Sequence, residues 1–140
     1  MRSGPILLID DDADDKDVFI DILTELKVTN PVIWFQNCDI AFTYLNTSTE
    51  QPFLIFCDLN LPGLSGLECK RMIDEHEELR KKSIPFVFSS TTVDQKSVND
   101  AYTQMTVQGF FQKPDSYSDL KDLIKLIIDY WDHCRHPNSQ

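Results

Sequence analysis

The chain has little positive charge: 13 Lys and Arg residues stand against 23 Asp and Glu residues, and the formal net charge is −10. Such a surface repels nucleic acid and anionic lipid. The short run Arg80-Lys81-Lys82 is its one basic cluster, and we interpret it as a solvated loop. No apolar run is long enough to cross a membrane, and only four apolar residues precede the first acids, so no signal peptide is indicated. We expect no direct contact with nucleic acid or membrane.

The sequence also lacks any pair of cysteines in a CxxC spacing. Its four cysteines are Cys38, Cys57, Cys69 and Cys134. The first three lie in segments whose apolar patterns indicate a core strand or helix. Reduced thiols in a cytoplasmic protein fit this distribution better than a disulfide framework does.

What is present is a regular alternation of short apolar runs and helical patterns. We predict strands over 6–9, 32–35, 53–58, 85–90 and 109–112. Helical spacing of apolar residues begins near Asp14, Ile40, Leu67, Asp94 and Ser118, and the charged stretch 75–83 is expected to be a helix end plus a long loop.

This alternation indicates an α/β fold with one parallel sheet covered by helices on both faces. At this length the flavodoxin-like (βα)5 arrangement with strand order 2-1-3-4-5 is the commonest solution. We expect one domain over residues 1–140, with its core at about 5–133 and no separate effector domain.

Polar residues stand at the carboxyl ends of four predicted strands. Asp58 ends the most apolar of them, the acidic run Asp10-Asp11-Asp12 follows the first, and Ser90 and Lys113 end the fourth and fifth. Taken singly, each has an ordinary explanation as a helix cap, a surface lysine or a solvated turn. In the predicted strand order, however, all lie at the edge where such sheets bind ligands.

Carboxylates that meet at one edge need a proton or a cation between them. Oxygen ligands without a neighbouring His or Cys favour a hard ion, and a site with few carboxylates fits Mg²⁺ better than Ca²⁺. A divalent cation, the ammonium of Lys113 and the hydroxyl of Ser90 could together neutralise a phosphoryl group during its transfer. Asp58 would then be the nucleophile.

These motifs resemble the receiver domains of two-component response regulators, in particular the stand-alone receivers that are like the chemotaxis regulator. The resemblance spans roughly 5–131. It is carried by Leu8-Ile9-Asp10-Asp11, by the segment from Asp58 to Glu68, by Pro85 through Thr91, and by Phe110-Phe111-Gln112-Lys113-Pro114.

The resemblance implies that Asp58 accepts a phosphoryl group from a histidine kinase. Asp11 and Asp58 would bind Mg²⁺ through their carboxylates, Asp10 through water, and Asn60 through its main-chain carbonyl. Lys113 would pair with Asp58.

The resemblance also implies a conformational switch. Ser90 would bind the phosphoryl group, and the ring of Phe110, where the family often has tyrosine, would move into the vacated space. The Lys113–Pro114 bond would be cis, and Asn60 and Thr92 would occupy positions that tune dephosphorylation.

With no effector domain expected, the output would be binding of a downstream protein. The expected surface is formed by the helix after Asp94, the strand 109–112 and the last helix, which could also form a homodimer. The chain would catalyse only its own phosphorylation and dephosphorylation and would not be an enzyme otherwise. A role as a phosphorelay intermediate or phosphate sink, passing the group to a histidine phosphotransfer protein, is an open alternative. A phosphatase of the haloacid dehalogenase type is disfavoured, because Asn60 stands where such an enzyme needs an acid.

Overall fold

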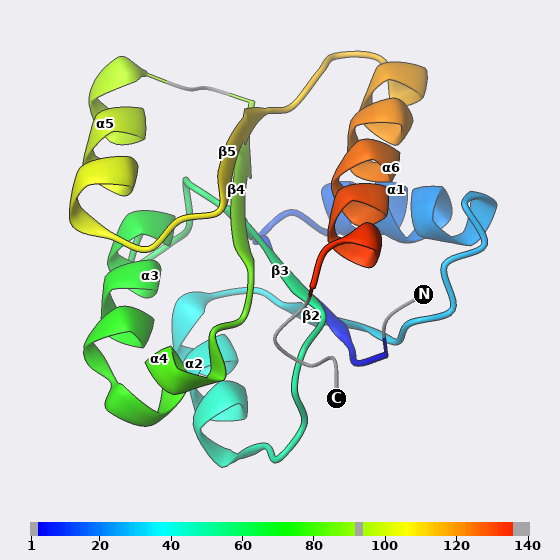
Figure 1. Cartoon of the computed structure of the whole chain (residues 1–140). Coiled ribbons are helices and arrows are strands. Elements are labelled where there is room, and N and C mark those ends of the chain that lie inside the picture. The colour runs from blue at the N-terminus through cyan, green and yellow to red at the C-terminus, as the bar shows by residue number, and fades with distance from the viewer. Residues whose placement is uncertain (1–2, 92–93, 136–140) are drawn as a thin grey trace.

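A computed structural model describes residues 3–91 and 94–135 and contains one five-stranded parallel sheet (Figure 1). The strands lie in the order β2-β1-β3-β4-β5, which confirms the predicted topology. Their bounds are β1 Ile6–Ile9, β2 Val32–Phe35, β3 Leu54–Asp58, β4 Phe86–Ser90 and β5 Gly109–Gln112. β1 and β3 are neighbours, with Ile9 beside Cys57, so the residues that follow these two strands emerge together.

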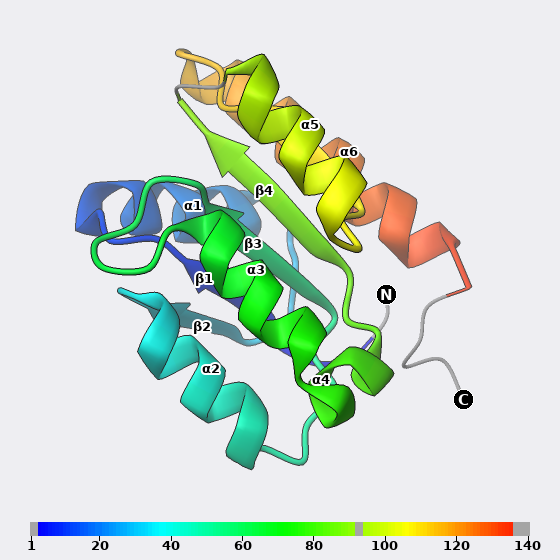
Figure 2. The ribbon, with the colours of Figure 1, turned by 90° about the vertical axis from the view of Figure 1, so that its left-hand side faces the viewer.

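Helices cover both faces of the sheet (Figures 1 and 2). Their bounds are α1 Ala13–Glu25, α2 Cys38–Thr47, α3 Gly66–Glu75, α4 Glu77–Lys82, α5 Gln95–Gln104 and α6 Tyr117–His133. Each of these helices begins at a residue whose side chain accepts a hydrogen bond from the first turn, and all of the caps except His76 are of types preferred at that position. These caps are Asp12, Asn37, Ser65, His76, Asp94 and Ser116.

The core lies in two layers because neighbouring strand residues point to opposite faces of the sheet. One layer packs Leu7, Ile9 and Ile55 against α2, α3, α4 and α5. The other packs Leu8 and Phe56 against α1 and α6. A sheet covered in this way holds the ends of its strands in fixed positions. No helix among the described residues is long and apolar enough to cross a membrane.

The charged stretch 75–83, expected to be a helix end plus a long loop, contains a separate short helix, α4. Its Leu79 is 3% exposed, and Lys81 pairs with Glu77 at 3.2 Å along the same helix. One buried side chain per turn is enough to hold a short helix against its neighbours, although the charges around Leu79 conceal it in the sequence.

The prediction of four reduced cysteines is wrong, because Cys38 and Cys69 form a disulfide. These residues are 31 positions apart, and their Cα atoms are 5.6 Å apart, within the range that a disulfide spans. The closeness arises because α2 and α3 lie side by side on one face of the sheet (Figure 2). Spacing along the sequence carries no sign of that packing.

Candidate functional site

Three carboxylates converge at the carboxyl edge of the sheet. Asp10 follows β1, Asp58 ends β3, and Asp15 lies in the first turn of α1. An oxygen from each lies within 4.8 Å of the others, which makes this group able to hold a metal ion. Asp10 is 2% exposed, so its charge is largely removed from water. The sheet topology thus concentrates negative charge at one place.

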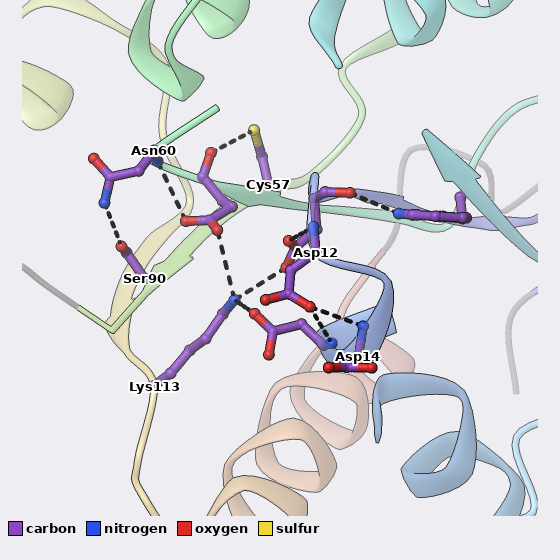
Figure 3. A network of polar contacts seen from close by, with 10 residues as sticks. Asp12, Asp14, Cys57, Asn60, Ser90 and Lys113 are labelled. Atoms are coloured by element: carbon purple, nitrogen blue, oxygen red, sulfur yellow. Dashed lines mark hydrogen bonds and ion pairs between the residues drawn. The ribbon is translucent and has the colours of Figure 1, made fainter. Parts of the chain in front are cut away.

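Lys113, which follows β5, reaches into this group (Figure 3). Its Nζ lies 3.1 Å from Asp10 Oδ2, 3.5 Å from Asp15 Oδ2 and 3.9 Å from Asp58 Oδ2. The Lys113 amide donates to the carbonyl of Ser90 at 2.8 Å, which fixes the lysine backbone to the end of β4. In this arrangement the lysine is closest to Asp10, although its pairing with Asp58 was the one expected.

Asn60 contacts both Asp58 and Ser90, and Figure 3 shows the side chains of Asn60 and Ser90 pointing toward one another. The Asn60 amide donates to Asp58 Oδ1 at 3.3 Å, and its side-chain Nδ2 donates to the Ser90 hydroxyl at 3.2 Å. Ser90 is 1% exposed. Because its oxygen accepts from Asn60, its hydroxyl proton remains available for an acceptor near Asp58.

Three hydrogen bonds hold Asp10 in place. Its Oδ1 accepts from the Asp12 amide at 2.9 Å, its amide donates to the Phe35 carbonyl at 3.0 Å, and its carbonyl accepts from Trp34 Nε1 at 2.6 Å. Asp12 in turn caps α1 by accepting from the amide of Asp14 at 2.8 Å. The acidic run therefore divides its roles: one residue enters the site and another starts a helix.

The structure brings most of the predicted site residues together, but the set of clustered carboxylates differs from the predicted one. Asp11 is exposed and lies outside the group of three carboxylates, whereas Asp15 was missed. The sequence did offer a signal for Asp15. It stands three residues after the cap Asp12, and that spacing places its side chain in the first turn of the helix, at the same edge of the sheet. Phe110 packs against Phe88 with ring centroids 5.5 Å apart.

Two expectations taken from the resemblance need comment. The Lys113–Pro114 bond is trans, since the described residues contain no cis peptide bond, and the expected cis form is wrong. Trans is the ordinary isomer before proline, and here it carries the chain from β5 toward α6. Thr92 lies outside the described residues.

Burial dominates the electrostatics of the site. It raises the pKa of Asp58, and Asp11 adds to this shift, while Lys113, the Asn60 amide and the Ser90 hydroxyl oppose it. Burial likewise raises the pKa of Asp10, against the Asp12 amide and Lys113.

Lys113 responds in the opposite sense. Burial by itself lowers the pKa of Lys113, but the charges of Asp10 and Asp58 outweigh that effect and raise it. The lysine therefore stays charged at neutral pH, among carboxylates that gain from a nearby cation.

The raised pKa values of these carboxylates predict that, when divalent ions are absent, the free energy of unfolding decreases as the pH rises from acid to neutral. In this window the folded state holds protons that the unfolded chain has released, so its relative stability drops as pH rises. We expect Asp58→Asn to raise the melting temperature at pH 7 by a few degrees and to have little effect at pH 3.

Calorimetry in the presence of chelator, at pH 7 and at pH 3, measures the melting temperatures of the variant and the wild type. Asp122→Asn, at an exposed position of α6, is the control for loss of one surface charge. An Asp58→Asn protein that melts below the wild type at pH 7 would contradict the prediction.

A family model for the response regulator receiver domain matches residues 6–125, and the chain belongs to this family. The probable methanogenesis regulatory protein FilR2 of Methanothrix harundinacea is 28% identical over 130 residues, which cover 90% of this chain and 82% of that protein.

Solved structures of response regulators are similar to this chain in fold. The phosphorylated cyanobacterial phytochrome response regulator RcpA superimposes with a TM-score of 0.87 at 25% identity, covering 98% of this chain and 100% of that one. The Mn²⁺-bound form of the response regulator Rcp1 gives a TM-score of 0.80 at 25% identity, covering 91% and 94%. Receiver domains bind Mg²⁺ at a cluster of aspartates, and this chain has such a cluster in Asp10, Asp15 and Asp58.

Proposed function

We propose that this chain accepts a phosphoryl group on Asp58 from a histidine kinase, in a Mg²⁺-dependent reaction, and thereby controls a partner protein. The observation that carries the proposal is the position of Lys113 Nζ, which lies 3.1 Å from Asp10 and 3.9 Å from Asp58. A fixed cation between a buried acid and a partly exposed acid is suited to neutralising the oxygens of an incoming phosphoryl group.

The donor set fits a hard divalent ion, because it consists of oxygens only. Asp10, Asp11 and Asp58, together with the main-chain carbonyl of Asn60, would hold Mg²⁺. The acid Asp15, found beside Asp10, is a further candidate. The ion, when bound, supplies positive charge that neutralises the phosphoryl oxygens.

The residues of the chain perform the transfer. A carboxylate oxygen of Asp58 attacks phosphorus, a new O–P bond forms, and the bond between phosphorus and the donor nitrogen of the kinase histidine breaks, leaving its electron pair on that nitrogen. Lys113 neutralises one phosphoryl oxygen and the Ser90 hydroxyl donates to another. The Ser90 hydroxyl can donate this proton while its oxygen still accepts from Asn60.

After transfer, the added charge on Asp58 would change how nearby side chains pack, and this change would be the switch. As Ser90 turns toward the phosphoryl group, the ring of Phe110 would move into the space that Ser90 vacates. Both residues belong to strands next to α5, so the face formed by α5, β5 and α6 is the proposed partner surface.

Exposed apolar side chains support this surface as a place of contact. Tyr102 is 53% exposed, Leu126 64% and Tyr130 56%. A hollow of about 330 Å³ between β5 and α6 is lined by Phe111 and Leu126, among others. A downstream protein, a phosphotransfer protein or a second copy of the chain could bind here. We place the protein in the cytoplasm, acting as a switch without turnover of other substrates.

The test is intact mass after incubation with Mg²⁺ and acetyl phosphate. We expect one phosphoryl adduct on the wild type and on the control Asp122→Asn, and none on Asp58→Asn or in excess chelator. An adduct that survives loss of Asp58, or a wild type that takes up no phosphoryl group, would refute the proposed function.

A further inference from the structure

The disulfide between Cys38 and Cys69 joins two helices on the face of the sheet opposite α1 and α6 (Figure 2). Cys38 is the first residue of α2 and is 1% exposed, and Cys69 lies in α3 and is 0% exposed. The chain has two other cysteines, Cys57 and Cys134, which are outside the disulfide. A cross-link at this depth fixes the position of one helix relative to the other.

Cys38 lies close in sequence to a residue that hydrogen-bonds to the backbone of Asp10. Cys38 comes three residues after Phe35, whose carbonyl accepts from the Asp10 amide at 3.0 Å. The start of α2 is therefore connected to the end of β1 by a short piece of chain and one hydrogen bond.

The Cys69 end is connected in the same way to Asp58. One turn before Cys69, the Gly66 amide donates to the Leu59 carbonyl at 2.9 Å. A Cβ at Gly66 would overlap the carbonyl oxygen of Asp58, so the first turn of α3 rests directly on the backbone of that acid. The disulfide thus ties the segment that supports Asp10 to the segment that supports Asp58.

We propose that Cys38 and Cys69 are a reversible redox-modification site that sets how firmly the two acid-bearing segments are held, and so how readily Asp58 is phosphorylated. This coupling rests on the proposed function. A disulfide in a protein of the cytoplasm meets a reducing environment, where such bonds are mostly transient or redox-sensing. A purely structural role would make the fold depend on a bond that this environment tends to break.

The co-reactant is a dithiol. One thiolate of the dithiol attacks one sulfur of the Cys38–Cys69 bond, and a mixed disulfide forms while the other cysteine leaves as a thiolate and takes up a proton. The second thiol of the reductant then closes its own disulfide. The protein gains two thiols, and the dithiol loses two electrons and two protons. Since both sulfurs are buried, the exchange requires local opening of α2 from α3.

Reduction should loosen both segments. In the oxidised chain the two segments are already ordered, whereas in the reduced chain the site must be ordered when Mg²⁺ and the phosphoryl donor bind. We expect reduction to slow labelling by acetyl phosphate by about fivefold or more. The amides of Asp10 and Gly66, whose hydrogen bonds support the site, should exchange their protons faster by a similar factor.

The experiment compares the air-oxidised chain with the chain in dithiothreitol. Alkylation in denaturant counts the thiols by mass, and we expect two in the oxidised chain and four in the reduced one. Hydrogen exchange at Asp10 and Gly66 is then measured in both states without metal, with Ile124 and Ile128 of α6 as amides on the opposite face. The rates at which acetyl phosphate phosphorylates the oxidised and reduced chains are measured in parallel, with Mg²⁺ present.

Two variants complete the design. Cys38→Ala with Cys69→Ala should match the reduced chain in both conditions, and Cys134→Ala should respond to dithiothreitol as the wild type does. Reoxidation of the reduced wild type should restore slow exchange, which separates the effect of the bond from any cavity left by alanine.

Four thiols in the air-oxidised chain would overturn the proposal. So would equal exchange at Asp10 and Gly66 in the two states, or an increase no larger than that at Ile124 and Ile128. These readouts need no phosphorylation. If the two amides respond and neither state is labelled, the redox control of the segments stands and the proposed function fails. If the amides respond and labelling proceeds equally in both states, the coupling to phosphorylation is refuted.

Discussion

Replacing Lys113 with methionine is expected to slow phosphoryl transfer to Asp58 by about 10²–10³-fold, the usual cost of removing one preorganised charge-stabilising group. The lysine is 14% exposed and touches all three clustered carboxylates, so no water or neighbouring side chain can reproduce its charge in the same place. Methionine keeps most of the side-chain volume and removes only the ammonium. The measurement is the rate at which the phosphoryl adduct appears by mass at saturating Mg²⁺.

The same variant should bind Mg²⁺ at least as tightly as the wild type, because the competing cation has gone while the carboxylates remain. A loss of rate with retained metal binding separates transfer chemistry from failure to assemble the site. Lys125→Met is the matched control: Lys125 is 59% exposed and pairs with Asp129 of its own helix, at 2.6 Å. A Lys113→Met rate within threefold of the wild type would contradict the assigned role.

Reduction of the Cys38–Cys69 disulfide is expected to lower the free energy of unfolding by about 3–4 kcal/mol. The bond closes a loop between residues 31 positions apart. Opening that loop returns conformational freedom mainly to the unfolded chain, and the looser hold on the two segments in the folded chain accounts for only a small part of the change. Urea denaturation with and without dithiothreitol measures the difference through the midpoint.

Two controls define the source of this effect. Cys134→Ala should lose as much stability on reduction as the wild type. The double variant Cys38→Ala with Cys69→Ala should be less stable from the start and insensitive to dithiothreitol. A reductant effect that persists in the double variant would show that the stability does not come from this bond.

Several features of the site could be predicted because they depend on the strands alone. Asp10 and Asp58 follow continuous apolar runs, and parallel strands bring their carboxyl ends to one edge. Once the order β2-β1-β3-β4-β5 is assumed, Ser90 and Lys113 must lie at the same edge. Only the period of the pattern and the length of the connections are needed for this step.

Other features depend on how helices pack, which the pattern does not encode. Asp15 enters the carboxylate group because α1 starts at the edge, and the side chain of Asn60 turns toward Ser90 and donates to it. The exposed position of Asp11 is likewise a matter of side-chain direction. Each of these is a difference of a few ångströms within an arrangement that the sequence leaves open.

The amino-acid sequence by itself determined the class of fold, the strand that carries Asp58 and the edge at which the acids and Lys113 meet. Only the tertiary structure decided that Cys38 and Cys69 are bonded, that α4 is a helix and that Lys113 lies nearest to Asp10. The physical reason is range. Periodicity and chain direction act between neighbours in sequence, whereas a disulfide or an ion pair needs atoms from distant segments within a few ångströms, and only close packing of the whole chain sets that distance.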